Sequence, residues 1–133
     1  MKEILILGSL PKNKKDILLY EAIFEICKSF ARNVSSPIDT ANSKDSDLIR
    51  YKRAFIKIKK ADLIIGEQTK PSTGQGMEIR EAIILKKPIL IVAKNGSSVS
   101  SLIKGCPEIK NIIYYKTLND LKTKLKNQLL KLK

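Results

Sequence analysis

Hydrophobic residues along this chain follow two alternating patterns, short unbroken runs and longer segments with helical spacing. The unbroken runs predict strands buried on both faces of a sheet, at 4–7, 63–65, 89–92 and 112–115. Between these runs, hydrophobic residues recur every three or four positions, as at Leu19, Ile23 and Ile26, which predicts amphipathic helices. The polar stretch 33–46 admits at most one further short strand, around Val34.

Strands and helices therefore alternate through the whole chain, which is typical of parallel sheets built from βαβ units. The helical segments begin after Pro11, at Asp47, near Gly76, near Ser100 and at Thr117. We predict one α/β domain over residues 1–133, a Rossmann-like (flavodoxin-like) open parallel sheet of about five strands with helices on both faces. Ligands of such sheets bind beyond the carboxyl ends of the strands, which directs attention to the loops 8–14, 67–78 and 93–101.

The composition narrows the possible chemistry. The chain has 133 residues and no histidine, which excludes Ser-His and Cys-His catalysis and removes the commonest zinc ligand. Its two cysteines, Cys27 and Cys106, lack metal-ligand spacing, so we expect no metal and no cofactor. No apolar run approaches the ~18 residues of a membrane span, and the chain starts without a secretory pattern. We expect a cytoplasmic protein with no membrane association.

The formal net charge of +13 favours anionic partners such as nucleotides, phosphates or nucleic acid. The basic residues, however, are scattered over nearly every predicted helix, where solvated helix faces account for most of them. Aromatic residues make up only 5% of the chain and are not interleaved with the basic ones as stacking platforms would be. This pattern disfavours nucleic-acid binding and leaves a small anionic ligand as the better hypothesis.

The loop after the second unbroken run carries the most informative residues. Its two glycines, Gly74 and Gly76, and the hydroxyl of Ser72 precede a predicted helix whose first amides are free to bind an anion. Glu78 falls in the first turn of that helix, at the rim of this site. Its carboxylate could react with a ligand or could simply offset the helix dipole, and the spacing leaves both open. The loop is not a phosphate-binding P-loop, because no Gly-Lys-Ser/Thr follows.

Residues 71–78, Pro-Ser-Thr-Gly-Gln-Gly-Met-Glu, resemble the Pro-Ser-x-Gly-x-Gly-x-Glu signature of the nucleoside 2-deoxyribosyltransferase superfamily. Within it the chain is most similar to the 2'-deoxynucleoside 5'-phosphate N-hydrolases. Residues 100–105, Ser-Ser-Leu-Ile-Lys-Gly, match that branch's Ser-x-x-Ile-basic-Gly segment, and Gly8-Ser9 matches the end of its first strand. The order and spacing of the three matches agree over most of the chain.

The resemblance implies an N-glycosidase that hydrolyses the base–sugar bond of (deoxy)nucleoside 5'-monophosphates, with Glu78 as the nucleophile of a retaining mechanism. The substrate-binding residues that it implies are Gly8, Ser9, Ser72, Gly74, Gly76 and Ser100. Of these, Ser72 and the two glycines after it would hold the 5'-phosphate, and Ser9 would line the sugar and base pocket. Ser100 would reach the phosphate bound by a neighbouring subunit, because the family's active site is shared across a homodimer.

Three positions depart from the family's pattern. An aspartate usually lies eight residues before the position of Asp62, and this chain has Ala54 there. The family's arginine after the first strand is Pro11, and its tyrosine on that strand is Leu5. The missing aspartate would place the sugar or handle the proton on the leaving base, and its loss would slow catalysis.

A carboxylate from the polar loop could replace the missing aspartate; the candidates are Asp39, Asp45 and Asp47. Two other functions remain open. The first is a nucleotide-binding protein of the same fold that has lost or altered catalysis, and the second is a nucleoside deoxyribosyltransferase, which would not need Ser100 as a phosphate ligand.

Overall fold

Strands and α-helices alternate along the chain as the sequence predicts, in a computed structural model that describes residues 1–109 and 111–132. The strands are β1 (Glu3–Leu7), β2 (Asn33–Ser35), β3 (Leu63–Glu67), β4 (Ile89–Lys94) and β5 (Ile112–Tyr115). The helices are α1 (Lys14–Cys27), the 3-10 helix η1 (Pro37–Thr40), α2 (Asp47–Lys60), α3 (Thr73–Ile84), α4 (Ser101–Lys104) and α5 (Leu118–Lys131).

All five strands of the described chain form one parallel sheet in the order β2-β1-β3-β4-β5. Leu5 of β1 pairs in register with Ile64 of β3, and Ile65 of β3 pairs with Leu90 of β4. This is the flavodoxin-like order, so the predicted fold class is confirmed. The strand order reverses between β1 and β3, and ligands of such folds bind beyond the strand ends at this point.

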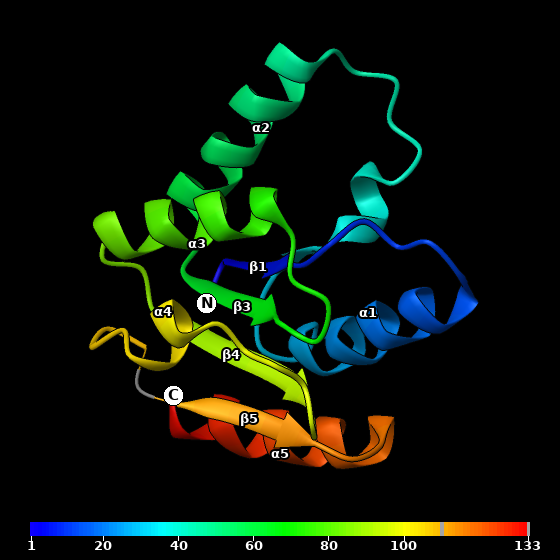
Figure 1. Cartoon of the computed structure of the whole chain (residues 1–133), viewed down its shortest axis with the longest axis vertical. Coiled ribbons are helices and arrows are strands. Elements are labelled where there is room, and N and C mark those ends of the chain that lie inside the picture. The colour runs from blue at the N-terminus through cyan, green and yellow to red at the C-terminus, as the bar shows by residue number, and fades with distance from the viewer. Residues whose placement is uncertain (110, 133) are drawn as a thin grey trace.

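Each face of the sheet buries its own core. Alternate residues of a strand point to opposite faces, so Ile4 and Ile6 pack beneath α1 and α5, whereas Leu5 and Leu7 pack beneath the α2 and α3 side. Figure 1 shows α1 and α5 together on one side of the sheet and α2 and α3 on the other. The strands are therefore apolar on both faces, which is why they are unbroken hydrophobic runs in the sequence.

The helix α3 begins at Thr73, three residues before the start near Gly76 that the sequence predicts. The cause is Ser72, which takes an extended conformation and accepts the amide hydrogen of Gln75 on its Oγ at 3.3 Å. A serine in this position supplies the acceptor that the first turn lacks. Gly74 and Gly76 thus lie inside the first turn of the helix rather than in the preceding loop.

No helix in the described part of the chain combines the length and the apolar character needed to cross a bilayer. Cys27, the last residue of α1, is fully buried in the core, and Cys106 is half-buried; both are free thiols. Across residues 1–109 and 111–132, no cluster of three or more His, Cys, Asp or Glu residues is arranged to hold a metal ion.

Candidate active site

A cavity of about 370 Å³ opens on the α2 and α3 side of the sheet, at the carboxyl end of β1. Its walls come from β1 and the loop after it, from η1 and the loop before α2, from α2, and from the start of α3. Four of the residues that the sequence predicts for the site line it: Gly8, Ser72, Gly74 and Glu78. The cavity lies where the strand order of the sheet reverses, as expected for a ligand site of this fold.

Glu78, which lines this cavity, has a carboxyl group whose pKa departs clearly from its ordinary value. Its side chain is half-buried, and burial raises the pKa of its carboxyl group to about 7, an effect that the nearby charge of Lys57 partly opposes. A carboxyl group with a pKa near 7 exists in both protonation states at neutral pH. Because α3 begins at Thr73, Glu78 lies beyond its first turn, so the sequence prediction that places Glu78 in the first turn is wrong. A raised pKa in a cavity makes Glu78 a candidate catalytic group.

The helix α2 brings three cationic side chains to the cavity wall, Arg50, Arg53 and Lys57, spaced at helical intervals. Arg53 forms an ion pair with Asp45, with 2.5 Å between Nη1 of Arg53 and Oδ2 of Asp45. Arg50 donates to the carbonyl oxygens of Ser43 and Asp45, which fastens the loop before α2 to that helix. The cavity therefore has a positively charged wall opposite the first turn of α3.

The first turn of α3 forms the other wall. The amides of Thr73 and Gly74 open the helix, where no carbonyl of a preceding turn is available to them. A Cβ atom added at Gly74 or Gly76 would meet no other atom within 4 Å, so packing within the described chain does not require glycine at either position. At Gly74, which lines the cavity, the open space allows a ligand to approach the backbone closely. The predicted site residue Gly76 lies outside the described lining, and its amide donates to the carbonyl oxygen of Ser72 at 3.1 Å.

Gln75 is a site residue that the sequence analysis missed. It is 1% exposed, and its Nε2 donates to the carbonyl oxygens of Leu7 at 3.3 Å and Glu67 at 2.8 Å. These bonds join the start of α3 to the ends of β1 and β3 and fix the orientation of the amide. Its Oε1 is buried without a hydrogen-bond partner among the described residues. A buried acceptor of this kind needs a donor, and Gln75 lines the cavity.

The structure does not bring Ser9 and Ser100 to this cavity within one protomer. Ser9 lines a second cavity, on the α1 and α5 side, and its carbonyl oxygen accepts the hydroxyl of Tyr20 at 2.6 Å. A Cβ at Gly8 would lie 2.2 Å from the Tyr20 Oη, so glycine there is needed to admit the tyrosine. Ser100 is the exposed N-cap of α4 and is absent from the described lining of either cavity.

Among the positions that depart from the family's pattern, Leu5 and Ala54 line the cavity and Pro11 does not. Leu5 is apolar and nearly buried, whereas Ala54 is half-buried on the α2 wall. The three loop carboxylates named above as replacements differ in placement. Only Asp45 lines the cavity; Asp39 instead accepts the amide hydrogen of Ser36 at 2.9 Å, and Asp47 lies in the first turn of α2 outside the described lining.

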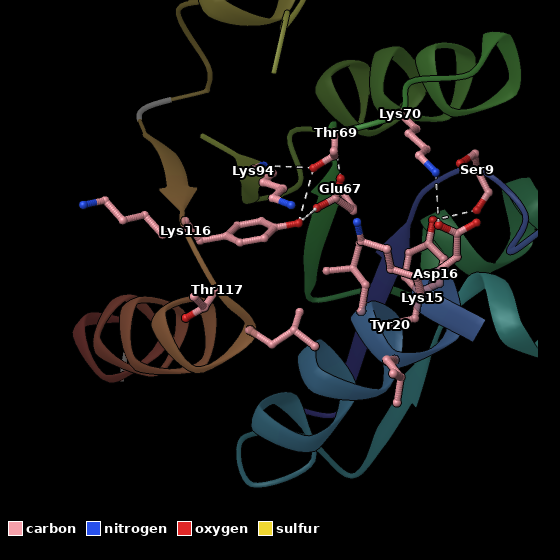
Figure 2. A pocket seen from close by; sticks show the side chains of 14 residues that line it. Ser9, Lys15, Asp16, Tyr20, Glu67, Thr69, Lys70, Lys94, Lys116 and Thr117 are labelled. Atoms are coloured by element: carbon pink, nitrogen blue, oxygen red, sulfur yellow. Dashed lines mark hydrogen bonds and ion pairs between the residues drawn. The ribbon is translucent and has the colours of Figure 1, made fainter. Parts of the chain in front are cut away.

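A second cavity, of about 290 Å³, opens between α1 and α5 on the opposite face of the sheet (Figure 2). At its base lies Glu67, which is 3% exposed and accepts hydrogen bonds from the Tyr115 hydroxyl at 2.8 Å and from the Thr69 amide. Burial raises the pKa of the Glu67 carboxyl above its usual range. This cavity shares no lining residue with that of Glu78 in the described chain.

Comparison with known proteins identifies the family. A protein of Syntrophotalea carbinolica, assigned by name to the 2'-deoxynucleoside 5'-phosphate N-hydrolases, is 31% identical over 129 residues, covering 92% of this chain and 90% of its own length. This chain belongs to that family. A 5-hydroxymethyl-dUMP N-hydrolase of Danio rerio is 25% identical over 134 residues, covering 84% of this chain and 94% of that protein. No protein-family profile matches the sequence.

Solved structures agree on the fold that the family shares. A CMP N-glycosidase of Clostridium botulinum superposes with a TM-score of 0.69 at 20% identity, over 93% of this chain and 98% of the other. A deoxyribosyltransferase of Leishmania mexicana superposes with a TM-score of 0.65 at 16% identity, over 95% and 98%. At these identities the superpositions establish the fold, and the family membership rests on sequence similarity.

Proposed function

We propose that this protein is a nucleotide N-glycosidase, which hydrolyses the base–sugar bond of (deoxy)nucleoside 5'-monophosphates with Glu78 as the nucleophile. The observation that carries the proposal is the placement of Glu78 in the cavity where the strand order reverses, with a carboxyl pKa raised by burial to about 7. The names of relatives in the family support the same reaction class, since these proteins are named as N-hydrolases of nucleotides.

The reaction proceeds in two displacements at the anomeric carbon of the sugar. In the first, a Glu78 carboxylate oxygen forms a bond to that carbon while the bond to the base nitrogen breaks, and the electron pair leaves with the base, which takes up a proton. In the second, water attacks the same carbon and gives up a proton, and the bond to Glu78 breaks. The free base and the sugar 5-phosphate leave, and Glu78 returns to its carboxylate form.

The charge of the cavity favours a nucleotide over a nucleoside. Three cations on α2, Arg50, Arg53 and Lys57, face a site whose acidic members are Asp45 and Glu78. The free amides at the start of α3, with the Ser72 hydroxyl beside them, provide donors for the oxygens of a 5'-phosphate. A nucleoside, the substrate of a deoxyribosyltransferase, carries no phosphate for these donors to bind, so the charge favours the N-hydrolase.

We propose that Asp45 takes over part of the role of the aspartate that the family usually has at the position of Ala54. Its carboxylate lines the cavity and is held by Arg53, and the loop that carries it is fastened by Arg50. A carboxylate held this way accepts hydrogen bonds, so we assign to it the placement of a sugar hydroxyl. The Oε1 of Gln75, which has no hydrogen-bond partner among the described residues, is a second acceptor of the cavity suited to a substrate hydroxyl or amino group.

We further propose a homodimer in which Ser100 serves the partner's site. Large apolar side chains are exposed on α2 and α3, namely Leu48 at 60%, Tyr51 at 57%, Ile56 at 53%, Met77 at 53% and Ile84 at 58%. An apolar surface of this extent is typical of a subunit interface. Ser100 lies outside its own protomer's cavity, as expected for a group that contacts a neighbour's ligand. The two free cysteines fit the reducing cytoplasm, which we retain as the expected compartment.

The experiment that tests the proposed function is incubation of the protein with a panel of ribo- and deoxyribonucleoside 5'-monophosphates, followed by chromatography for free base. We expect base release from at least one member of the panel. The variant Glu78→Gln keeps the shape of the side chain and removes the attacking charge, so its rate should fall by about three orders of magnitude or more while nucleotide binding survives. Ser72→Ala tests the phosphate contact separately, because it should weaken binding of the monophosphate more than that of the nucleoside.

If the wild-type protein binds nucleotides but releases no base from any of them, the alternative of a nucleotide-binding protein without catalysis holds. The specific observation in its favour is that Leu5 and Ala54 place apolar side chains in the cavity where the family has a tyrosine and an aspartate. Equal hydrolysis by wild type and Glu78→Gln would instead show that Glu78 is not the nucleophile.

A further inference from the structure

The second cavity lies at the same end of the sheet as the first but on its other face. It is bounded by α1 and the start of α5, and by the segments that follow β1, β3, β4 and β5. This is again the edge at which parallel sheets bind ligands. At about 290 Å³ it lies at the lower end of the size range of small-molecule sites. Nothing in the proposed reaction uses it.

Among the described residues, none pairs the charge of Glu67 at the base of this cavity. Within residues 1–109 and 111–132, no lysine or arginine forms an ion pair with it, although it is 3% exposed. Its Oε2 accepts the Tyr115 hydroxyl and its Oε1 accepts the Thr69 amide, which leaves a further lone pair on each oxygen. Burying a carboxyl group is costly, so an arrangement that holds one in place without pairing its charge calls for a function.

The rest of the cavity changes character from base to mouth. Its walls include the side chains of Leu18, Leu19 and Leu118. Its mouth carries exposed lysines, at positions 15, 70, 94 and 116, against the single acidic side chain of Asp16, which is 3.5 Å from the Nζ of Lys70. Figure 2 shows the Lys15 side chain extending into the cavity toward Glu67, whereas that of Lys116 points away. The cavity thus combines a polar base, apolar walls and a cationic rim.

We propose that this cavity is a second nucleotide site, which binds a nucleoside phosphate with its base against Glu67 and its phosphate at the lysines of the mouth. The apolar walls suit the faces of a heterocyclic base, and the lysines suit a phosphate, which offers only acceptors. The inference goes beyond the proposed function and does not depend on it, because the two cavities have no lining residue in common.

The chemistry of Glu67 selects among bases. A carboxylate oxygen accepts a hydrogen bond from an exocyclic amino group, and a protonated carboxyl group can at the same time donate to the ring nitrogen beside it. Adenine and cytosine present this pair of an amino group and an acceptor nitrogen on one edge. We therefore assign to the site a nucleotide with an amino-bearing base of this kind.

The test uses the whole 133-residue chain with Glu78→Gln, so that no nucleotide is consumed, and follows backbone amide resonances during titration. The probes are adenosine 5'-monophosphate, purine riboside 5'-monophosphate, which lacks the amino group, and ribose 5-phosphate. The amides of Lys15, Lys116 and Thr117 report the second cavity, and those of Gly74 and Gln75 report the first. We expect adenosine 5'-monophosphate to shift both sets, with its own saturation curve for each.

The double variant Lys15→Glu/Lys94→Glu should weaken binding at the second cavity at least about tenfold and leave the first unchanged. The matched control is Lys28→Glu/Lys126→Glu, which makes the same charge change at exposed lysines outside both cavities. Because all four lysines are exposed, these variants should fold. Glu67→Gln, where it folds, should reduce the preference for adenosine over purine riboside monophosphate.

Three results would overturn the proposal. One is the absence of any shift at Lys15, Lys116 and Thr117 at millimolar adenosine 5'-monophosphate. Another is an equal effect of the double variant and its charge-matched control. The third is equal affinity of the second cavity for the amino and the deamino nucleotide. A failure of the proposed N-glycosidase reaction would change none of these readouts, because they record binding at residues that the reaction does not use.

Discussion

The two faces of the sheet are covered in different ways. On one face, α5 buries Leu121, Leu125 and Leu129 completely, and with α1 it closes a continuous core. On the other face, Ile58 is the only fully buried side chain of α2, a helix that the structure describes in full. Figure 1 shows α2 standing away from the body of the domain, joined to η1 by an open loop.

The strands are apolar on both faces of the sheet, so the difference in packing comes from the helices that cover each face. The packed face holds a narrow cavity between its two helices, and the loosely packed face holds the cavity of Glu78. Where α2 stands away from α3 there is space for a substrate, and the apolar residues left exposed there suit a second subunit. Proteins commonly give up packing at functional sites and recover stability elsewhere.

Truncation of a core leucine on the packed face should have the largest effect on stability. Leu125→Ala should lower the free energy of unfolding by about 2–5 kcal/mol, because the cavity it leaves lies in a closed core. Ile56→Ala on α2 should cost less than about 0.5 kcal/mol in a dilute protomer, where the side chain is 53% exposed. Urea denaturation at two protein concentrations measures the free energy of unfolding of both variants. A large, concentration-independent loss for Ile56→Ala would contradict the comparison.

The face of the molecule formed by α2 and α3 should form the dimer interface. Ile56→Glu introduces a charge into the exposed apolar surface of α2, so we expect it to convert a dimer into a monomer, as measured by light scattering at micromolar concentration. Lys28→Glu, at an exposed position at the end of α1, is the control and should leave the mass unchanged. A wild-type protein that is already monomeric would rule out the dimer and the role of Ser100 in the partner's site.

The fold was predictable because its determinants are local. Strands buried on both faces are unbroken apolar runs, and helices packed on one side carry a stripe, so residues such as Ile64 and Leu125 reveal their environment in sequence. The sequence predicts the start of α3 three residues too late, because the side chain of Ser72 substitutes for a helical acceptor and extends the helix toward β3. The family membership was equally readable from the residues around Glu78.

The remainder of the site depends on contacts that no local pattern encodes. Gln75 is a polar residue in a polar stretch of sequence, and nothing in its neighbourhood predicts that it is buried between the start of α3 and the ends of β1 and β3. The helical spacing of Arg50, Arg53 and Lys57 places them on α2 but does not say what they face. The second cavity joins Glu67 to Tyr115, 48 residues apart, through the order of the strands. Such sites follow from topology rather than from a motif.

Glu78 should make the loosely packed face sensitive to pH. Burial raises the pKa of its carboxyl group from an ordinary 4.5 to about 7, so its contribution to stability is complete below pH 4.5 and is lost as pH rises through 7. Glu78→Gln removes the titration and should stabilise the protein at pH 8 by about 1–3 kcal/mol, discounted because the side chain is only half-buried, with little change at pH 4.5. Thermal denaturation of both proteins between pH 4.5 and pH 8 measures this difference in stability. An equal difference at both pH values would contradict the assignment.

The smallest expected effect concerns Lys57, which acts on Glu78 through its charge. Its positive charge lowers the pKa of the Glu78 carboxyl and so partly opposes the effect of burial. The nucleophile must be ionised to attack, so the hydrolysis rate should rise with pH through about 7 in the wild type. Lys57→Met keeps much of the side-chain volume without the charge, and the midpoint of that rise should move upward by less than about one pH unit. Lys60→Met, one helical turn further along α2 and outside the described lining, should leave the midpoint in place. A downward shift in Lys57→Met would show that the lysine does not stabilise the ionised carboxylate, and an equal shift in both variants would assign the effect to the general charge of α2 rather than to this contact.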